Sequence, residues 1–260
     1  VWVDEASKNY YDLVNVEGGS KVYESPVKDN AALATLTIND GDYIFLAAGE
    51  FNIPVSAKGK ELTIIGAGDK TVINVIPGGQ GEANGQLDYN FDGSTVTFRD
   101  LTIKTNNQTY AGYARLTGTY VNCVMEQCYC LNGNSEFIDC KFNVSGNQYN
   151  LWTWGAPVAK FEKCVFNSDG KALLLYGPVN TQLTINNSVF NDSGVLTDLK
   201  AAIEIGDDYN KSYELIVNNT EVNGYEENNA GIPTGTTLWA NKNSMPKERL
   251  NVVVDGIDVY

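Results

Sequence analysis

The stretch Phe137-Ile138-Asp139-Cys140-Lys141-Phe142 contains a pattern that recurs along most of the chain. Its first and sixth places are apolar, its third is turn-forming, and its fourth is small or apolar. The other copies occupy residues 98–103, 120–125, 161–166, 185–190, 217–222 and 254–259. The third places are held by Asp100, Asn122, Asp139, Lys163, Asn187, Asn219 and Gly256. Most of these residue types tolerate a left-handed backbone, so each copy is interpreted as two short strands joined at one left-handed corner.

Copies of this size cannot bury their apolar side alone, so they must stack and share one core. Their fourth places form a column inside the stack, occupied by Leu101, Cys123, Cys140, Cys164, Ser188, Thr220 and Ile257. The uneven spacing of the copies fits coils of three strands with loops of unequal length, and no long segment has the 3.6-residue period of a helix. The sequence therefore predicts an all-β fold, a parallel β-helix.

Composition limits the classes of partner. The chain has 260 residues, 43% of them hydrophobic, and a formal net charge of −14. This charge argues against nucleic acid and against an anionic membrane surface, because both bind basic patches. No apolar run is long enough to span a membrane. The repeat favours one elongated body over two separate domains.

Three of the five cysteines share the fourth-place column: Cys123, Cys140 and Cys164. We expect them to be buried, unpaired and stacked at the strand spacing of about 4.8 Å. Cys128 and Cys130 form a C-x-C pair, but the chain contains no histidine and no second such pair. A zinc site is therefore not expected, and no metal ligands are assigned.

The N-terminal segment, residues 1–30, lacks the repeat and is interpreted as a lead-in or a cap. Around residues 29–36 the sequence predicts one or two helical turns with Asp29 as N-cap. Residues 31–260 are assigned to the β-helix. Because the last copy of the repeat ends one residue before Tyr260, we expect this β-helix to be part of a longer chain.

The segments GDYIFLAAGEF (residues 41–51) and LTIIGAG (residues 62–68) follow the predicted short helix. This arrangement resembles the first coils of right-handed parallel β-helices of the pectin-lyase-like superfamily, and the resemblance covers roughly residues 30–260. It implies a right-handed β-helix. It does not imply one activity, because the architecture is used by lyases, hydrolases, phage tailspikes and non-catalytic adhesins.

Catalysis by imidazole is excluded, because the chain has no histidine. Polygalacturonate hydrolases of the superfamily carry Gly-His-Gly and Arg-Ile-Lys segments, and this chain has neither. Its pectate lyases need clustered carboxylates for Ca²⁺ and an arginine base, but Arg99, Arg115 and Arg249 are isolated in sequence. If the protein is an enzyme, the acid and base groups are expected to be Glu204, Asp207 and Asp208. Two other interpretations stay open for these carboxylates: a solvated strand end with an outward Glu204, and a Ca²⁺ site.

Aromatic residues are the second group of candidates, because their rings stack on the apolar faces of sugars. Trp152 and Trp154 are two residues apart on a strand, so both must lie in the core or both at the surface, and a core position is favoured. The predicted ligand-binding residues are Trp154, Tyr176, Glu204, Asp207, Asp208, Tyr209 and Trp239. Aligning the coils on their turn residues places Thr153, Leu175, Glu204 and Trp239 in one outward column.

These features favour a non-catalytic β-helix module of a microbial surface protein, located outside the cell or at its surface. Its expected partner is a glycan or another cell-surface polymer. One alternative is a polysaccharide lyase or glycosidase that works through carboxylates, and another is a phage tailspike body. No cofactor is expected apart from Ca²⁺ in the interpretation above, and the oligomeric state stays open.

Overall fold

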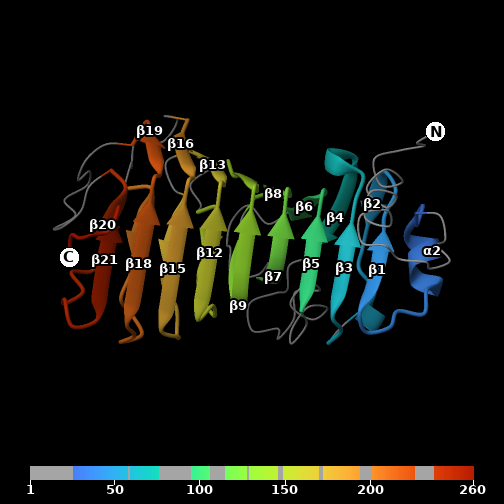
Figure 1. Ribbon diagram of the computed structural model, residues 1–260, viewed down its shortest axis with the longest axis horizontal. Helices are drawn as coiled ribbons and strands as arrows, with labels where there is room; N and C mark the ends of the chain where they lie inside the picture. Colours follow the sequence, from blue (N-terminus) through green and yellow to red (C-terminus); the bar gives the residue numbers. More distant parts are fainter. Residues whose placement is uncertain are drawn as a thin grey trace.

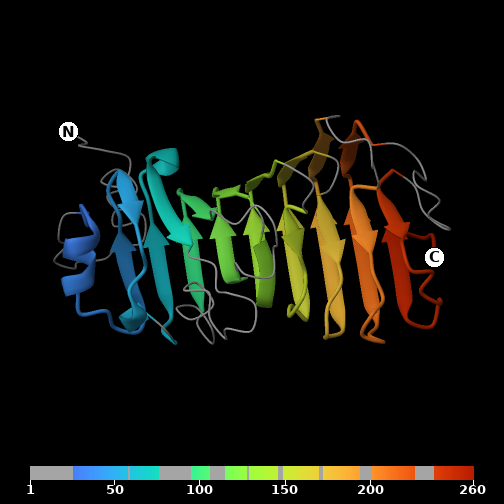
Figure 2. The same cartoon turned by 180° about the vertical axis from the view of Figure 1, so that it is seen from behind.

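The computed structural model describes residues 26–57, 59–75, 95–105, 115–127, 129–145, 149–169, 172–193, 201–225 and 237–260. Within these residues the protein is an elongated parallel β-solenoid, with one short α-helix at one end and the C-terminus at the other (Figures 1 and 2). The predicted all-β parallel fold is confirmed. Most of the predicted lead-in over residues 1–30 lies outside the described residues.

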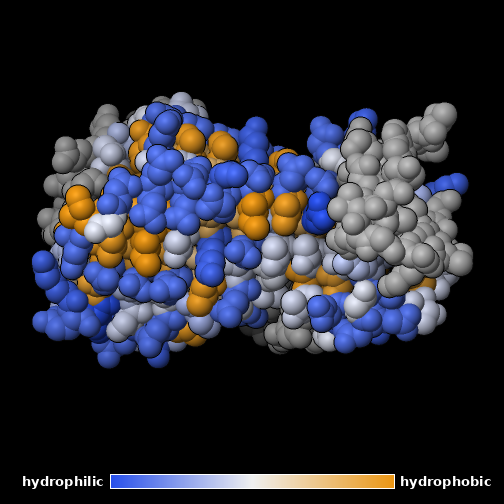
Figure 3. Space-filling model, viewed as in Figure 1, coloured by the Kyte–Doolittle hydropathy of each residue, from blue (hydrophilic) through white to orange (hydrophobic). Residues whose placement is uncertain are grey.

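The front of the solenoid in Figure 1 is one row of parallel strands, called sheet A here, to which most coils contribute one strand. Hydrophilic side chains cover most of its outer surface, with short apolar rows between them (Figure 3). Its parallel strands are β1 (Asp42–Phe45), β3 (Leu62–Ile65), β5 (Val96–Arg99), β7 (Arg115–Val121), β9 (Tyr129–Ile138), β12 (Val158–Glu162), β15 (Thr181–Asn186), β18 (Tyr213–Asn218) and β21 (Leu250–Val254). The short antiparallel strand β22 (Ile257–Asp258) pairs with β21 at the edge.

The second wall, called sheet B, is an eight-stranded parallel sheet. It consists of β2 (Gly49–Phe51), β4 (Thr71–Val75), β6 (Thr102–Thr105), β8 (Val124–Glu126), β10 (Lys141–Asn143), β13 (Val165–Ser168), β16 (Val189–Asp192) and β19 (Glu221–Asn223). Two 3-10 turns accompany the first coils, η1 (Val55–Ala57) and η2 (Gly68–Lys70).

The third wall, called face C, is built from short strands in the C-terminal half. They are β11 (Leu151–Trp152), β14 (Leu173–Leu175), β17 (Ile203–Ile205) and β20 (Trp239–Asn241). These strands join sheet A through β9, which is long enough to pair with β11 at its start and with β12 at its end. In β7 and β9 the chain therefore passes from face C to sheet A without leaving the strand.

The corner between sheet A and sheet B is a single left-handed residue, as the repeat predicts. The φ angles of Asn122, Asp139, Asn187 and Asn219 lie between 46° and 53°. Carboxamides at successive corners pair, since Asn219 Nδ2 donates to Asn187 Oδ1 at 2.8 Å. The Asn and Asp residues of the repeat therefore set the local backbone and also link neighbouring coils.

Replacing Asn187 by valine should destabilise the protein by about 1–2 kcal/mol, because a β-branched side chain is strained in the left-handed region. The change also removes the hydrogen bonds that Asn187 makes with Glu162 and Asn219. Chemical denaturation measures the cost, and Asn187→Gly is the control because glycine adopts this backbone without strain. Equal stability of Asn187→Val and the wild-type protein would show that the corner imposes no such restriction.

Stacked rings fill the solenoid. In sheet A the ring of Phe137 lies between those of Tyr120 and Phe161, with centroid distances of 4.7 and 4.9 Å. In sheet B the rings of Phe142, Phe166 and Phe190 form a second stack, with centroid distances of 4.7 and 4.4 Å. Because the coils are in register, a residue of one coil packs directly on its equivalent in the next, and the ring stacks follow from the repeat.

The cysteine column is confirmed. Cys123, Cys140 and Cys164 are buried free thiols. They stack on one another, because the residues that follow them, Val124, Lys141 and Val165, are register partners on adjacent strands. Burial raises the pKa of the Cys123 and Cys164 thiols above the usual value, so both remain protonated and unreactive. Cys128 lies outside the described residues.

The N-terminal end of the described solenoid is covered by the helix α2 (Asn30–Thr35). Its N-cap is Asp29, whose side chain accepts a hydrogen bond from the Ala32 amide at 2.8 Å, as predicted. Leu33 of this helix is buried in the main core. An amphipathic helical turn thus shields the apolar interior of the first coil.

The C-terminal end departs from the repeat. Asp255 and Gly256 both have positive φ, and β22 turns back to pair with β21 in antiparallel orientation. The last copy of the pattern therefore forms a hairpin instead of another coil, and its Ile257, predicted to lie in the buried column, is 65% exposed. The loop before β21 covers the last coil by placing Met245 in the core.

Candidate functional site

The strand register of face C corrects the predicted outward column. Thr153 and Leu175 are equivalent, but their partners in the next coils are Ile205 and Asn241, not Glu204 and Trp239. The turn residues used for the sequence alignment are not equivalent in space, because Gly206 and Asn241 lie one and two register positions earlier in their coils than Gly177 does. The outward column that the structure forms consists of Trp152, Leu174, Glu204 and Ala240.

Glu204 points away from the main core, as predicted, but it is not solvated. Its side chain is only 1% exposed. The hydroxyl of Tyr149 donates a hydrogen bond to Oε2, and the Lys242 ammonium lies 3.5 Å from the same oxygen. The carboxylate is itself buried and is held by Tyr149 and Lys242, so the interpretation of Glu204 as a solvated strand residue is wrong.

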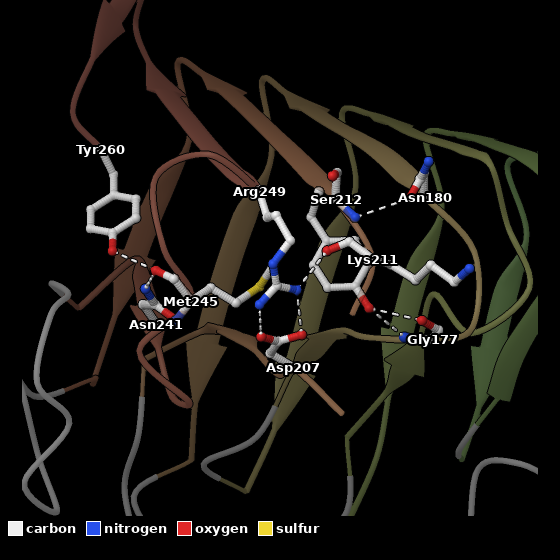
Figure 4. Close-up of polar contacts among 10 residues, drawn as sticks. Gly177, Asn180, Asp207, Lys211, Ser212, Asn241, Met245, Arg249 and Tyr260 are labelled. Atoms are coloured by element: carbon white, nitrogen blue, oxygen red, sulfur yellow. Dashed lines mark hydrogen bonds and ion pairs between the residues drawn. The ribbon is translucent and has the colours of Figure 1, made fainter. Parts of the chain in front are cut away.

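Trp239 is a core residue and not part of an accessible surface. It pairs in register with the buried Ile203 and is 4% exposed. Its ring packs against that of Tyr260 at a centroid distance of 5.8 Å. The Tyr260 hydroxyl donates to the Met245 carbonyl, and Asn241 makes two further hydrogen bonds to Met245 (Figure 4). Trp239 therefore holds the end of the solenoid together.

Asp207 forms a bidentate ion pair with Arg249, and the same guanidinium donates to the Lys211 carbonyl at 3.1 Å (Figure 4). The hydrogen bonds from Arg249 hold the pKa of Asp207 below its usual value. Arg249 and Asp207 are 42 positions apart, so no local sequence pattern marks them as a pair. The pair fixes the loop after β17 to the loop before β21.

This ion pair predicts an acid-dependent contribution to stability. Because the folded-state pKa of Asp207 is lowered, the contribution is complete above the unfolded-state value of about 3.9 and is lost as the pH falls through the folded-state value. Thermal melts from pH 7 to pH 2 should show wild-type protein more stable than Asp207→Asn at pH 7, with the difference shrinking below about pH 4. A difference that stays constant down to pH 2 would contradict this role.

Four aromatic side chains from adjacent coils form a cluster on the outside of face C, called the aromatic platform here: Trp152, Trp154, Tyr176 and Tyr209. Tyr176 lies at its centre, with ring centroids 6.1 Å from Trp152, 6.0 Å from Trp154 and 5.3 Å from Tyr209. Trp152 and Trp154 are both partly exposed, so they share one environment as expected, but the favoured core position is wrong.

Hydrogen bonding fixes the orientation of the platform. The Tyr176 hydroxyl donates to Asp208 Oδ2 at 2.9 Å, and Asp208 is exposed. Burial and the hydrogen bond to Asp208 raise the pKa of Tyr176, so its hydroxyl remains a donor at physiological pH. Tyr209 is 37% exposed and packs edge-on against Trp154 at 5.5 Å. The platform thus presents rigid ring faces beside an acceptor.

The structure separates the predicted carboxylates into three different interactions. Glu204 contacts Tyr149 and Lys242, whereas Asp207 contacts Arg249 and Asp208 contacts Tyr176. Within the described ranges, no group of three His, Cys, Asp or Glu side chains is arranged to hold a metal ion. Of the predicted ligand-binding residues, the structure brings together Trp154, Tyr176, Asp208 and Tyr209. Tyr149 and Lys242 carry no repeat signal that marks them in the sequence.

Comparison with protein-family models, with curated proteins and with solved structures found no match. The part of the chain that the structure describes contains no helix long and apolar enough to cross a membrane.

Proposed function

We propose that this protein is a non-catalytic glycan-binding module of a microbial surface protein, working outside the cell or at its surface. The observation that carries the proposal is the aromatic platform of Trp152, Trp154, Tyr176 and Tyr209, with the Asp208 carboxylate beside it. Flat rings accept the apolar C–H faces of sugars, and a neighbouring carboxylate accepts hydrogen bonds from sugar hydroxyls.

The scaffold supports this use. The platform residues lie on face C and in the loops that follow it, and each is attached to a strand that pairs with its neighbours. A rigid surface loses little conformational entropy when it binds a ligand. The proposal extends to the finer fold assignment, a right-handed β-helix similar to those of the pectin-lyase-like superfamily.

Catalysis receives less support than binding. An acid–base pair must reach the substrate, but Glu204 is buried under Tyr149 and Lys242, and Asp207 is occupied by Arg249. The enzyme alternative makes a separate prediction, because Glu204→Gln would abolish turnover in a depolymerisation assay. The binding proposal instead expects no turnover in the wild-type protein or in Glu204→Gln.

Replacing Trp154 by alanine should weaken glycan binding by about 1–3 kcal/mol, the range for losing the burial of a large apolar side chain. Isothermal titration calorimetry against soluble oligosaccharides measures the loss. The control is Tyr43→Ala, because Tyr43 is a more accessible aromatic, 48% exposed, on β1 at the far end of the solenoid. Unchanged affinity in Trp154→Ala, or an equal loss of affinity in Tyr43→Ala, would show that the platform is not the glycan-binding site.

A further inference from the structure

A polar groove of about 310 Å³ lies where sheet B ends, beside face C. It is lined by residues at the ends of β8, β10, β13 and β16, which are consecutive neighbours in the sheet. The groove therefore runs along the solenoid axis over four coils, a length of about 14 Å at the ordinary strand spacing. Such a groove fits an extended chain better than a compact molecule.

A ladder of carboxamides forms one side of this groove. Asn143 donates to Glu126 at 2.8 Å, Asn167 donates to Asn143 at 2.8 Å, and Asn191 donates to Asn167 at 3.1 Å. Each of these hydrogen bonds uses one of the two N–H groups of the donor carboxamide. Within the described ranges the second N–H of each asparagine has no acceptor, so it can bind, at one position per coil, a ligand with regularly spaced hydroxyls.

The groove selects against anions. The charged side chains that line it are Glu126, Asp169 and Asp192, and none of its described lining residues is a lysine or arginine. Asp169 accepts a hydrogen bond from Ser193 at 2.6 Å, so this carboxylate is held in place. A polymer of uronic acids would bring its carboxylates against these three groups, whereas an uncharged sugar chain avoids this repulsion.

The groove adjoins the aromatic platform. Val144, which lines the groove, packs against Trp152 of the platform. We propose that the two form one continuous site for a linear, uncharged glycan, whose sugars stack on the platform at one end and hydrogen-bond to the asparagine ladder at the other. This inference rests on the proposed function and adds the charge and the length of the ligand.

Three probes test it by calorimetry: a β-1,4-linked glucose hexasaccharide, the disaccharide of the same sugar, and an α-1,4-linked galacturonate hexasaccharide. The neutral hexasaccharide should bind about tenfold or more tightly than the disaccharide, since the longer chain gains one or more hydrogen bonds in the groove. The galacturonate should bind more weakly than the neutral hexasaccharide.

Two groove variants locate this gain. Asn167→Asp replaces an N–H donor of the ladder by a carboxylate oxygen. Ser145→Tyr fills the groove with a ring, from an exposed position outside the core. Both should remove the advantage of the hexasaccharide and leave disaccharide affinity unchanged, and melting temperatures confirm folding. Three results would show that the groove is not part of the binding site. They are equal affinity for the two chain lengths, a hexasaccharide advantage that persists in Ser145→Tyr, and galacturonate binding as tight as that of the neutral hexasaccharide. None of these results would contradict glycan binding at the platform. If no probe binds to wild-type protein, the proposed function fails and the groove with it.

Discussion

Replacing Phe137 by alanine should destabilise the protein by about 3–5 kcal/mol, the usual cost of removing a fully buried aromatic ring. The Phe137 ring is stacked between Tyr120 and Phe161, and a third ring, Phe142 of sheet B, packs edge-on against it at 5.1 Å. The cavity left by alanine cannot close, because the main-chain hydrogen bonds of the coils above and below fix their separation.

Urea denaturation followed by circular dichroism measures this change. Tyr43→Ala serves as the control, because that ring is 48% exposed and its removal should cost less than about 0.5 kcal/mol. A Phe137→Ala cost below about 1 kcal/mol would mean that the ring stacks do not carry the packing of the core.

Replacing Gly177 by alanine should cost about 3 kcal/mol, because the added methyl group has no free space. A Cβ at this position would lie 1.9 Å from the Trp154 carbonyl oxygen and 2.5 Å from its carbon, so the backbone of the neighbouring coil must move. The amide and the carbonyl of Gly177 are also both bonded to the Tyr213 hydroxyl, at 3.0 and 2.8 Å. Movement here displaces Trp154, so glycan binding should weaken together with stability.

Gly155→Ala is the matched control for this substitution. Its Cβ would lie 2.8 Å from Asn132 Oδ1, a side-chain atom that can rotate away, and 3.3 Å from the nearest backbone atom. Its cost should therefore be clearly smaller than that of Gly177→Ala when both are measured by urea denaturation. Equal costs for the two variants would contradict the close approach of the coils at Gly177.

The parts of the fold that sequence predicted are those determined by local patterns. The left-handed corners, the Asp29 cap and the cysteine column each depend on a few neighbouring residues. The last copy of the repeat was misassigned because its hexad fits the pattern, while Asp255 next to Gly256 makes a two-residue hairpin turn.

The candidate site was harder to predict, because it depends on register between coils and on loop contacts. A shift of one residue moves a side chain to the opposite side of a strand. Relative to Glu204, the predicted register was wrong by one residue at Trp239, so a core residue was assigned to the outward column. The partners of Glu204 and Asp207, namely Tyr149 and Arg249, come from coils 55 and 42 positions away in sequence. The rings of Trp154, Tyr176 and Tyr209 were identified because their residue types alone suggest sugar contact.

The most direct test of a glycan-binding platform is a tryptophan fluorescence titration of the wild-type protein with the neutral hexasaccharide. Trp152 and Trp154 are partly exposed on the platform, whereas Trp239 is buried. The account predicts a saturable change in emission that matches the calorimetric affinity and that is reduced in Trp154→Phe, which keeps a ring but removes the indole. A saturable calorimetric signal with no change in emission would place the glycan elsewhere on the protein, and the absence of both signals across neutral and acidic oligosaccharides would contradict glycan binding itself.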